Sequence, residues 1–399
     1  MSIFYSFSAL RGLAMGIFSP IWILYLISKD YDFLQIGLMG AVLEIAKLIF
    51  EVPSGVFADR YGIKISIASS FFFSILTWAF FPFIDSAAIC ILAMIIWALS
   101  DSLISGSFET WMSRVAGEDR FGKEMMKNTQ LLITFLIIGS IASGYLYSLN
   151  IYFPFLLVMV IYLLLFIWMS VFIKVPSVSE TNHGDQNQHD SIKIIKESLK
   201  IIFNKKRVLL IVIAGFFTAT AYDTISRYWQ PFLSDLGFSE KSLGYIFALG
   251  GFTALVLLTL TIRFEKKIEK NPYLALTSLD SMGMVMTFLL SRAFRPLGIP
   301  CTAFLLAIED IHHPIVTSYL NKFFPDSYKN TLFSLNSGVG AIGEILSGVI
   351  FGIISAAFGL SAMFVVVAVF LLIPIILYTI VPKIKDNDMK VQIEKSQQV

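Results

Sequence analysis

Long apolar runs separated by short charged or turn-rich connections dominate this sequence. A helix needs about 20 mostly apolar residues to cross a bilayer, and windows of that length predict helices near 3–27, 35–57, 65–84, 87–113, 127–149, 151–174, 207–233, 240–262, 273–291, 298–322, 330–354 and 360–381. Only 15% of the 399 residues are charged, whereas a soluble domain carries about 25%. We therefore predict an all-α membrane protein with twelve transmembrane helices.

The most polar long segment, VPSVSETNHGDQNQH at 175–189, separates two groups of six predicted helices. We predict an N-terminal bundle at 1–174, a cytoplasmic linker at 175–206, a C-terminal bundle at 207–382 and a disordered cytoplasmic tail at 383–399. Within the linker, apolar side chains recur at helical spacing while lysines occupy the other faces. This pattern predicts a helix lying in the lipid interface, with a solvated helix as the alternative. The residues concerned are Ile192, Lys193, Ile195, Lys196, Leu199, Lys200, Ile202 and Phe203.

Two short matches relate the halves. Lys127-Asn128-Thr129 and Lys329-Asn330-Thr331 each open the fifth helix of their half, and Ile36-Gly37 and Leu243-Gly244 each open the second. Matches in the same order and place predict two pseudo-symmetric bundles from a duplicated unit, as in many transporters.

Basic residues are unequally divided between alternate loops. With both termini on one side, the loops and tail of that side hold 23 Lys and Arg, and the opposite side holds four. Cytoplasmic loops carry the excess of basic residues. The chain is therefore predicted to sit in the cell (inner or plasma) membrane with both termini cytoplasmic, and its charge gives no support for nucleic-acid binding.

The first charged turn, EVPSGVFADRYGIK at 51–64, joins the second and third predicted helices. It resembles the signature loop of the major facilitator superfamily, GxLaDRxGRK, at Gly55, Asp59, Arg60, Gly62 and Lys64. The resemblance implies a fold in which the first, fourth, seventh and tenth helices line a central cavity while the third, sixth, ninth and twelfth face lipid. It further implies that the charged residues of the loop latch the two halves together in one state and release them in the other.

Two other segments look like small bacterial efflux members of that family: SGSFETW at 105–111 and Trp229-Gln230-Pro231. The arginine by which the family couples protons in its fourth helix is absent, and Asp101 lies in that region. The fifth helix also lacks the glycine-proline pattern of drug/proton antiporters. Tyr228 and Trp229 are predicted either to gate the cavity or to anchor the helix at the headgroups.

Ionisable groups inside the predicted helices are the candidate site residues, because each costs at least about 2.5 kcal/mol in a bilayer and should face a cavity or a partner. They are Arg11, Asp101, Glu109, Asp223, Arg227, Glu309, Asp310, His312 and His313. Asp280, in a helix expected to face lipid, has no explanation in this pattern.

Spacing suggests how these groups are used. Asp101, Ser105 and Glu109 recur every four residues and share one helical face, which favours a proton site or a site for a substrate cation. The alternative for Glu109 is an ion pair with Arg114 or with a base of the signature loop. Asp223 and Arg227 form either an ion pair or part of a proton relay.

The second helix carries Glu44, Lys47 and Glu51 on one face, which favours a charge network between helices, with Glu344 as a counterpart in the other half. In the tenth helix, Glu309, His312 and His313 allow three interpretations. They are a metal site with HExxH-like spacing, proton exchange between histidine and carboxylate, and structural hydrogen bonds beside a kink at Pro314.

These observations favour a monomeric secondary transporter that exports a drug-like or natural-product compound by alternating access, with protons as the coupling ion. Uptake of a metabolite or siderophore is the first alternative. An intramembrane metalloenzyme at the tenth helix, or a sensor derived from a transporter, are the others. We expect no catalytic residue, no cofactor and no bound metal. Cys90 and Cys301 lie far apart in sequence and predict no disulfide.

Overall fold

The computed structural model describes residues 2–116, 118–173, 196, 199–200, 202–321 and 329–384. All regular secondary structure in these ranges is helical, as predicted. Most of the predicted linker (175–206) and tail (383–399) lies outside the described residues. Of the predicted interfacial helix, Lys196, Leu199, Lys200 and 202–204 are described and are helical.

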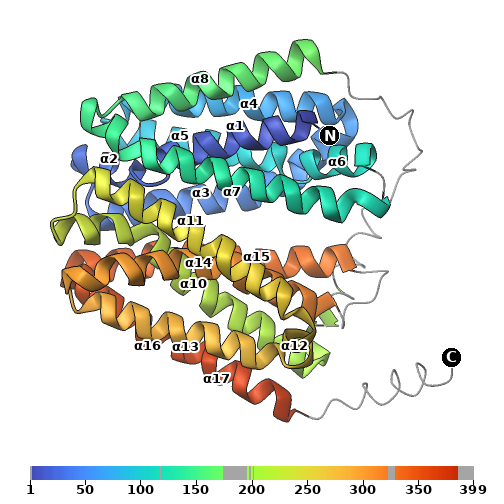
Figure 1. Cartoon of the computed structure of the whole chain (residues 1–399), viewed down its shortest axis with the longest axis vertical. Helices are drawn as coiled ribbons and strands as arrows, with labels where there is room; N and C mark the ends of the chain where they lie inside the picture. Colours follow the sequence, from blue (N-terminus) through green and yellow to red (C-terminus); the bar gives the residue numbers. More distant parts are fainter. Residues whose placement is uncertain are drawn as a thin grey trace.

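The helices fall into two groups, coloured blue to green and yellow-green to red in Figure 1. The first group contains α1 (Ser2–Phe18), α2 (Trp22–Ser28), α3 (Phe33–Tyr61), α4 (Ile63–Phe80), η1 (Phe81–Phe83), α5 (Ala87–Ile104), α6 (Ser107–Ala116), α7 (Glu118–Leu149), α8 (Phe153–Ile167) and η2 (Trp168–Phe172). The second contains α10 (Lys206–Asp235), α11 (Glu240–Arg263), α12 (Glu265–Lys270), α13 (Pro272–Ser291), α14 (Arg295–Asn321), α15 (Lys329–Phe358), α16 (Leu360–Phe370), α17 (Leu372–Ile380) and η4 (Val381–Lys383). We call these groups the N half and the C half.

Eleven spans of the described chain are long and apolar enough to cross a bilayer. The tenth predicted helix, α14, is the one predicted span outside these eleven. It is 27 residues long, and at about 1.5 Å per residue it exceeds the hydrocarbon thickness of about 30 Å. Its run of Glu309, Asp310, His312 and His313 lowers its hydropathy, because these polar groups replace apolar side chains. The fold is therefore an all-α membrane protein, as predicted.

Several predicted helices are interrupted. The first divides at Ser19, Pro20 and Ile21, because Pro20 has no backbone N–H to continue the hydrogen-bond ladder. The fourth divides at Ser105 and Gly106, where Gly106 adopts φ +71°. Such a φ is readily reached by glycine, so the chain turns there and begins α6 in a new direction.

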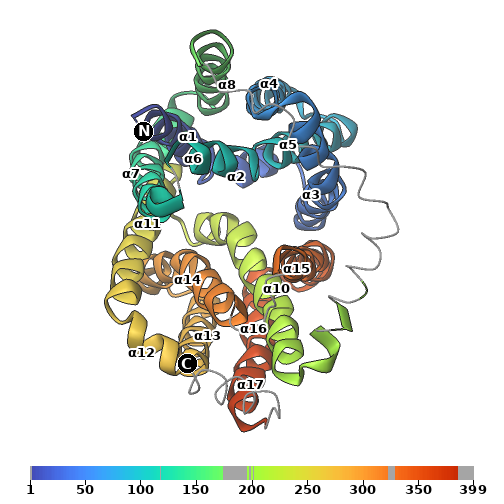
Figure 2. The ribbon, with the colours of Figure 1, turned by 90° about the vertical axis from the view of Figure 1, so that its right-hand side faces the viewer.

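The two ends of the molecule differ in which connections they carry. One end holds the turn at Asp30, the α7–α8 turn and the α10–α11 turn, and we call it the Asp30 end. The other holds the turn at Gly62, α12 and the ends of the described chain, on the right in Figure 1, and we call it the Gly62 end. Figure 2 views the molecule from the Gly62 end, with the N half above the C half.

Glycines permit close packing inside the N half. A Cβ added to Gly12 or Gly16 of α1 would collide with the backbone of α7 at Leu132 or Leu136. Close backbone approach through small residues is the usual way for membrane helices to pack. It fixes α1 and α7 as a rigid pair beside the cavity described below.

Candidate functional site

The two halves are sealed together at the Asp30 end by two helix pairs. Gly37 of α3 and Gly348 of α15 are so close that a Cβ on either would collide with the carbonyl oxygen of the other. In the second pair, a Cβ on Gly144 of α7 would collide with the backbone of Glu240 in α11. Because backbone meets backbone in both pairs, water and solute are excluded there.

Side chains of α10 complete this seal. The Tyr228 hydroxyl donates a hydrogen bond to the carbonyl of Phe33 at 2.8 Å, and the Gln230 amide donates to the carbonyl of Ser19 at 2.7 Å. Tyr228 and Trp229 are 0% and 1% exposed. The headgroup-anchor interpretation of these two rings is therefore wrong, because both are buried: Tyr228 contacts the N half through Phe33, and Trp229 packs on Phe247 of α11.

The Gly62 end is open between the same elements. A Cβ added to Gly55 of α3, Gly215 of α10 or Gly338 of α15 would meet no atom within 4 Å. Glu51 and Val52, within about three turns of the end of α3, are exposed. The helices that touch at the Asp30 end therefore diverge towards the Gly62 end.

A cavity of about 500 Å³ lies within the N half and is lined by all three predicted cavity residues of that half, Arg11, Asp101 and Glu109. Its charged lining residues are Arg11, Lys47, Glu51, Asp101 and Glu109. The spacing argument for Asp101, Ser105 and Glu109 assumed one continuous helix, and that assumption is wrong because the chain turns at Gly106. All three residues nevertheless line this cavity. The side chain of Arg114, the alternative partner of Glu109, lies outside the described residues.

Aromatic rings form the part of this cavity nearest the Asp30 end. The ring centroids of Phe18 and Trp78 are 4.3 Å apart, and Trp97 lies 5.3 Å from Phe18 and 5.4 Å from Trp78. Rings in such contact hold one another in place. The cavity thus offers an apolar, aromatic wall beside a group of charges.

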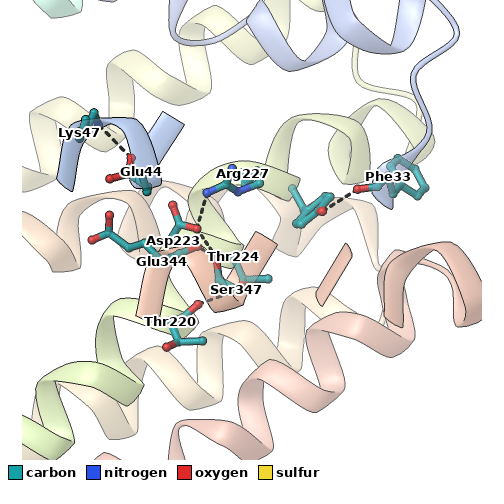
Figure 3. Close-up of polar contacts among 10 residues, drawn as sticks. Phe33, Glu44, Lys47, Thr220, Asp223, Thr224, Arg227, Glu344 and Ser347 are labelled. Atoms are coloured by element: carbon teal, nitrogen blue, oxygen red, sulfur yellow. Dashed lines mark hydrogen bonds and ion pairs between the residues drawn. The ribbon is translucent and has the colours of Figure 1, made fainter. Parts of the chain in front are cut away.

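A cluster of charges lies where the sealed and open parts of the interface meet (Figure 3). Asp223 accepts a hydrogen bond from Arg227 at 2.5 Å, so these two residues form the ion pair that was one of their two predicted arrangements. Asp223 also accepts from the hydroxyl of Ser347 in α15. The Arg227 guanidinium lies against Gly40 of α3, in the space that a Cβ would fill. This pair therefore joins three helices from both halves.

The predicted charge network of the second helix borders this cluster. Lys47 donates to Glu44 at 2.9 Å within α3. Glu344 of α15 lies beside Asp223, on the side where Glu44 lies, as Figure 3 shows. Both halves thus contribute acids to the same region, as the sequence pattern of α3 and Glu344 suggested.

A second cavity, of about 240 Å³, lies in the C half and is lined by Tyr222, Glu309, His312, His313 and Glu344 among others. The Nε2 atom of His312 lies 3.7 Å from a carboxylate oxygen of Asp280 in α13. No three His, Cys, Asp or Glu side chains are grouped to hold a metal ion within the part of the chain that the structure describes. Asp310 is exposed, and α14 continues through Pro314 without a break.

The signature loop is a tight turn at the Gly62 end. α3 ends at Tyr61 and α4 begins at Ile63, with Gly62 between them at φ +92°, a conformation that favours glycine. Lys64 donates to the carbonyl of Ser170 at 2.9 Å, within its own half, and the Arg60 guanidinium lies 5.4 Å from the Tyr61 ring. The side chain of Asp59 lies outside the described residues. These contacts leave Lys64 and Arg60 on the N half while this end is open.

Comparison with known proteins decides the family. The family model of the Major Facilitator Superfamily matches residues 4–308, well over half of the chain. The chain belongs to this superfamily. It is therefore a multi-pass membrane transporter.

Solved transporters share the fold over nearly the whole chain. The nucleoside transporter NupG matches with a TM-score of 0.75 and 13% identity, covering 96% of this chain and 98% of its own. A D-xylose–proton symporter matches with a TM-score of 0.74 and 13% identity, over 94% and 96%. A bacterial homologue of the human lysosomal transporter Spinster, in an inward-facing and unoccupied conformation, matches with 0.75 and 11%, over 95% of each chain.

Sequence reasoning missed the residues that act across helices. Gly40, Ser347 and Thr218 gave no signal, because their roles depend on what lies opposite them in another helix. Asp280 did give one, since a carboxylate in a helix expected to face lipid required a partner. Its hydrogen bonds to Tyr222 and Thr218, and its approach to His312, supply that partner.

Proposed function

We propose that this transporter exports an amphipathic organic compound by alternating access, in exchange for protons. The proposal rests chiefly on one observation: cavities lined by ionisable residues lie towards the Gly62 end, while the Asp30 end is sealed. The Gly62 end also carries the excess of basic loops, which assigns it to the cytoplasm. Solute thus enters from the cytoplasm in the present state.

The lining of the cavities supports a compound with a positive charge and an apolar body. Acidic groups outnumber the fixed basic groups Arg11 and Lys47 around the two cavities. The aromatic wall of Phe18, Trp78 and Trp97 provides faces for a cation as well as apolar area. An anionic substrate would instead require an excess of arginine and lysine.

Asp101 is the residue that we propose to carry the coupling proton in the N half. It lines the same cavity as Arg11 and Lys47, so a change in the charge of Asp101 alters the electrostatic energy of any charged solute in the cavity. A carboxylate there binds either a cationic solute or a proton, because the two compete for the same negative charge. Competition of this kind produces exchange of solute for proton.

The test begins with a thermal-shift screen of the purified protein against lipophilic cations such as tetraphenylphosphonium, neutral aromatics, sugars and organic anions. Compounds that bind the folded form raise its melting temperature. We expect cations to give the larger shifts, and more at pH 8 than at pH 6. A preference for anions would contradict the proposed substrate class.

Compounds found in this way are then tested in proteoliposomes with an imposed proton gradient. We expect the compound to accumulate against its own concentration gradient, and this accumulation to collapse when an uncoupler is added. Asp101→Asn should lower the accumulation at least tenfold. Its binding of the compound should be retained but depend less on pH. Accumulation driven in the same direction as the protons would favour the alternative, proton-coupled uptake. Movement of the compound at the same rate with and without the proton gradient would refute coupling.

A further inference from the structure

Asp280 is a fully buried carboxylate in a peripheral helix, α13. Its exposed fraction is 0%. The hydroxyl of Tyr222 donates to one of its oxygens at 3.1 Å, and the hydroxyl of Thr218 lies 3.5 Å from the other. Both donors belong to α10, which borders the cavity of the C half. Two hydroxyl donors stabilise a carboxylate but do not balance its charge.

The group placed to balance that charge is His312. Its Nε2 atom lies 3.7 Å from Asp280 and 3.5 Å from the Tyr378 hydroxyl. Beyond Tyr378, α16 and α17 carry no ionisable side chain. The described lysines of α12, which also touches α13, are exposed at the Gly62 end. Among described residues, no Lys or Arg is within ion-pair distance of Asp280.

The position of this group relative to the cavity gives it access to protons. Tyr222, Thr218 and His312 line the cavity of about 240 Å³ together with the acids Glu309 and Glu344, and Asp280 lies behind them. Gly283, one turn after Asp280, makes room for this arrangement, because a Cβ there would collide with the Tyr222 hydroxyl. Water in the cavity can therefore exchange a proton with His312, whereas Asp280 is reached through it.

We propose that Asp280 and His312 form a proton-binding site in which the proton is carried by the imidazole of His312. With the proton bound, imidazolium and carboxylate sum to zero charge. When the proton leaves to the cavity water, a neutral imidazole and a buried carboxylate remain, and the pair is anionic.

The use of this site in transport rests on the proposed function. The anionic state of the pair attracts a cationic solute into the neighbouring cavity, together with the acids Glu309 and Glu344. The neutral state lets the solute go. The site thus adds a second point of exchange, in the C half, to the one proposed at Asp101.

The test is nitrogen NMR of the purified full chain labelled with ¹⁵N-histidine in lipid nanodiscs. The sequence has four histidines, and replacing the two of the linker (His183→Gln and His189→Gln) leaves His312 and His313. The two signals are assigned by His313→Gln as well as by His312→Gln, so that one assignment survives if a variant fails to fold. We expect His312 in the wild-type pair to show the doubly protonated signal at neutral pH.

The matched variant is Asp280→Asn, in which the doubly protonated signal of His312 is expected to be lost while that of His313 is unchanged. A wild-type His312 that is singly protonated at neutral pH overturns the proposal, whether or not Asp280→Asn folds. Failure of this site leaves gradient-driven transport in proteoliposomes intact. Failure of the proposed function removes that transport but leaves the NMR result as expected.

Discussion

The two ends of the interface between the halves use the same helices and have opposite packing. At the Asp30 end, α3 and α15 meet through Gly37 and Gly348 with no room for a methyl group. At the Gly62 end of the same helices, Gly55 and Gly338 face open space. The glycines at the Asp30 end therefore form the contact between the helices, whereas those at the Gly62 end have no neighbour in the present state.

This contrast indicates how the molecule changes state. A transporter that works by alternating access must break the seal at one end and form another at the opposite end. The charged residues of Figure 3 lie between the two ends, so opening or closing either end must rearrange their contacts. Variants at the two ends, and at the cluster between them, therefore test the comparison directly.

The largest effect is expected from Gly37→Ala. The added methyl overlaps the carbonyl of Gly348, and overpacking of a tight contact costs about 3 kcal/mol. Gly55→Ala is the matched control on the same helix, and it should be neutral or stabilise the protein by up to about 1 kcal/mol because alanine favours helix. Thermal unfolding of the two purified variants measures the difference. Equal shifts at both positions would mean that the ends are not packed differently.

An intermediate effect is expected from Arg227→Met. Removing the guanidinium leaves Asp223 without its counter-ion in a mostly buried position, which we expect to cost about 2 kcal/mol. The double variant Asp223→Asn/Arg227→Met should recover most of this loss. Lys47→Met, whose side chain is 34% exposed, should cost less than the single Arg227 change. The ranking is read from melting temperatures, and a double variant as unstable as Arg227→Met would contradict it.

The smallest effect is expected from Lys29→Met at the Asp30 end. Lys29 pairs with Asp85 at 2.6 Å within the N half, and Asp85 is 71% exposed, so solvent screens the pair to less than about 1 kcal/mol. The hydrogen bond to Asp85 raises the pKa of Lys29. This contribution is therefore fully present below about pH 10 and is lost as the pH rises through the raised pKa. The difference in melting temperature between the wild type and Lys29→Met should be smaller above pH 11 than at pH 7.

The Lys29–Asp85 pair also sharpens the comparison of the two ends, because both residues belong to the N half. Lys29→Met should leave the distances between the halves unchanged in spin-label measurements. A change there would show that loops of the Asp30 end help to hold the seal.

Apolar length and the signature loop were enough to predict the fold, because membrane crossing imposes a length and Gly62 imposes a turn. The cavity residues of α1, α5 and α14 were also found, since a charge in a bilayer requires an explanation. The break at Gly106 was missed because an apolar window does not register a single residue with positive φ. The roles of Gly40, Ser347 and Tyr222 depend on distant helices, and no local pattern encodes them.

The most direct test measures distances between α3 and α15 at both ends of the interface. Pairs of spin labels at exposed positions, Val52 with Ser337 near the Gly62 end and Leu38 with Ile353 near the Asp30 end, are compared in the wild type and in Gly37→Trp. Both pairs are built on a background in which the buried Cys90 and Cys301 are replaced. We predict that the tryptophan lengthens the Leu38–Ile353 distance and shortens the Val52–Ser337 distance together. Lengthening at one end with no shortening at the other would contradict the account.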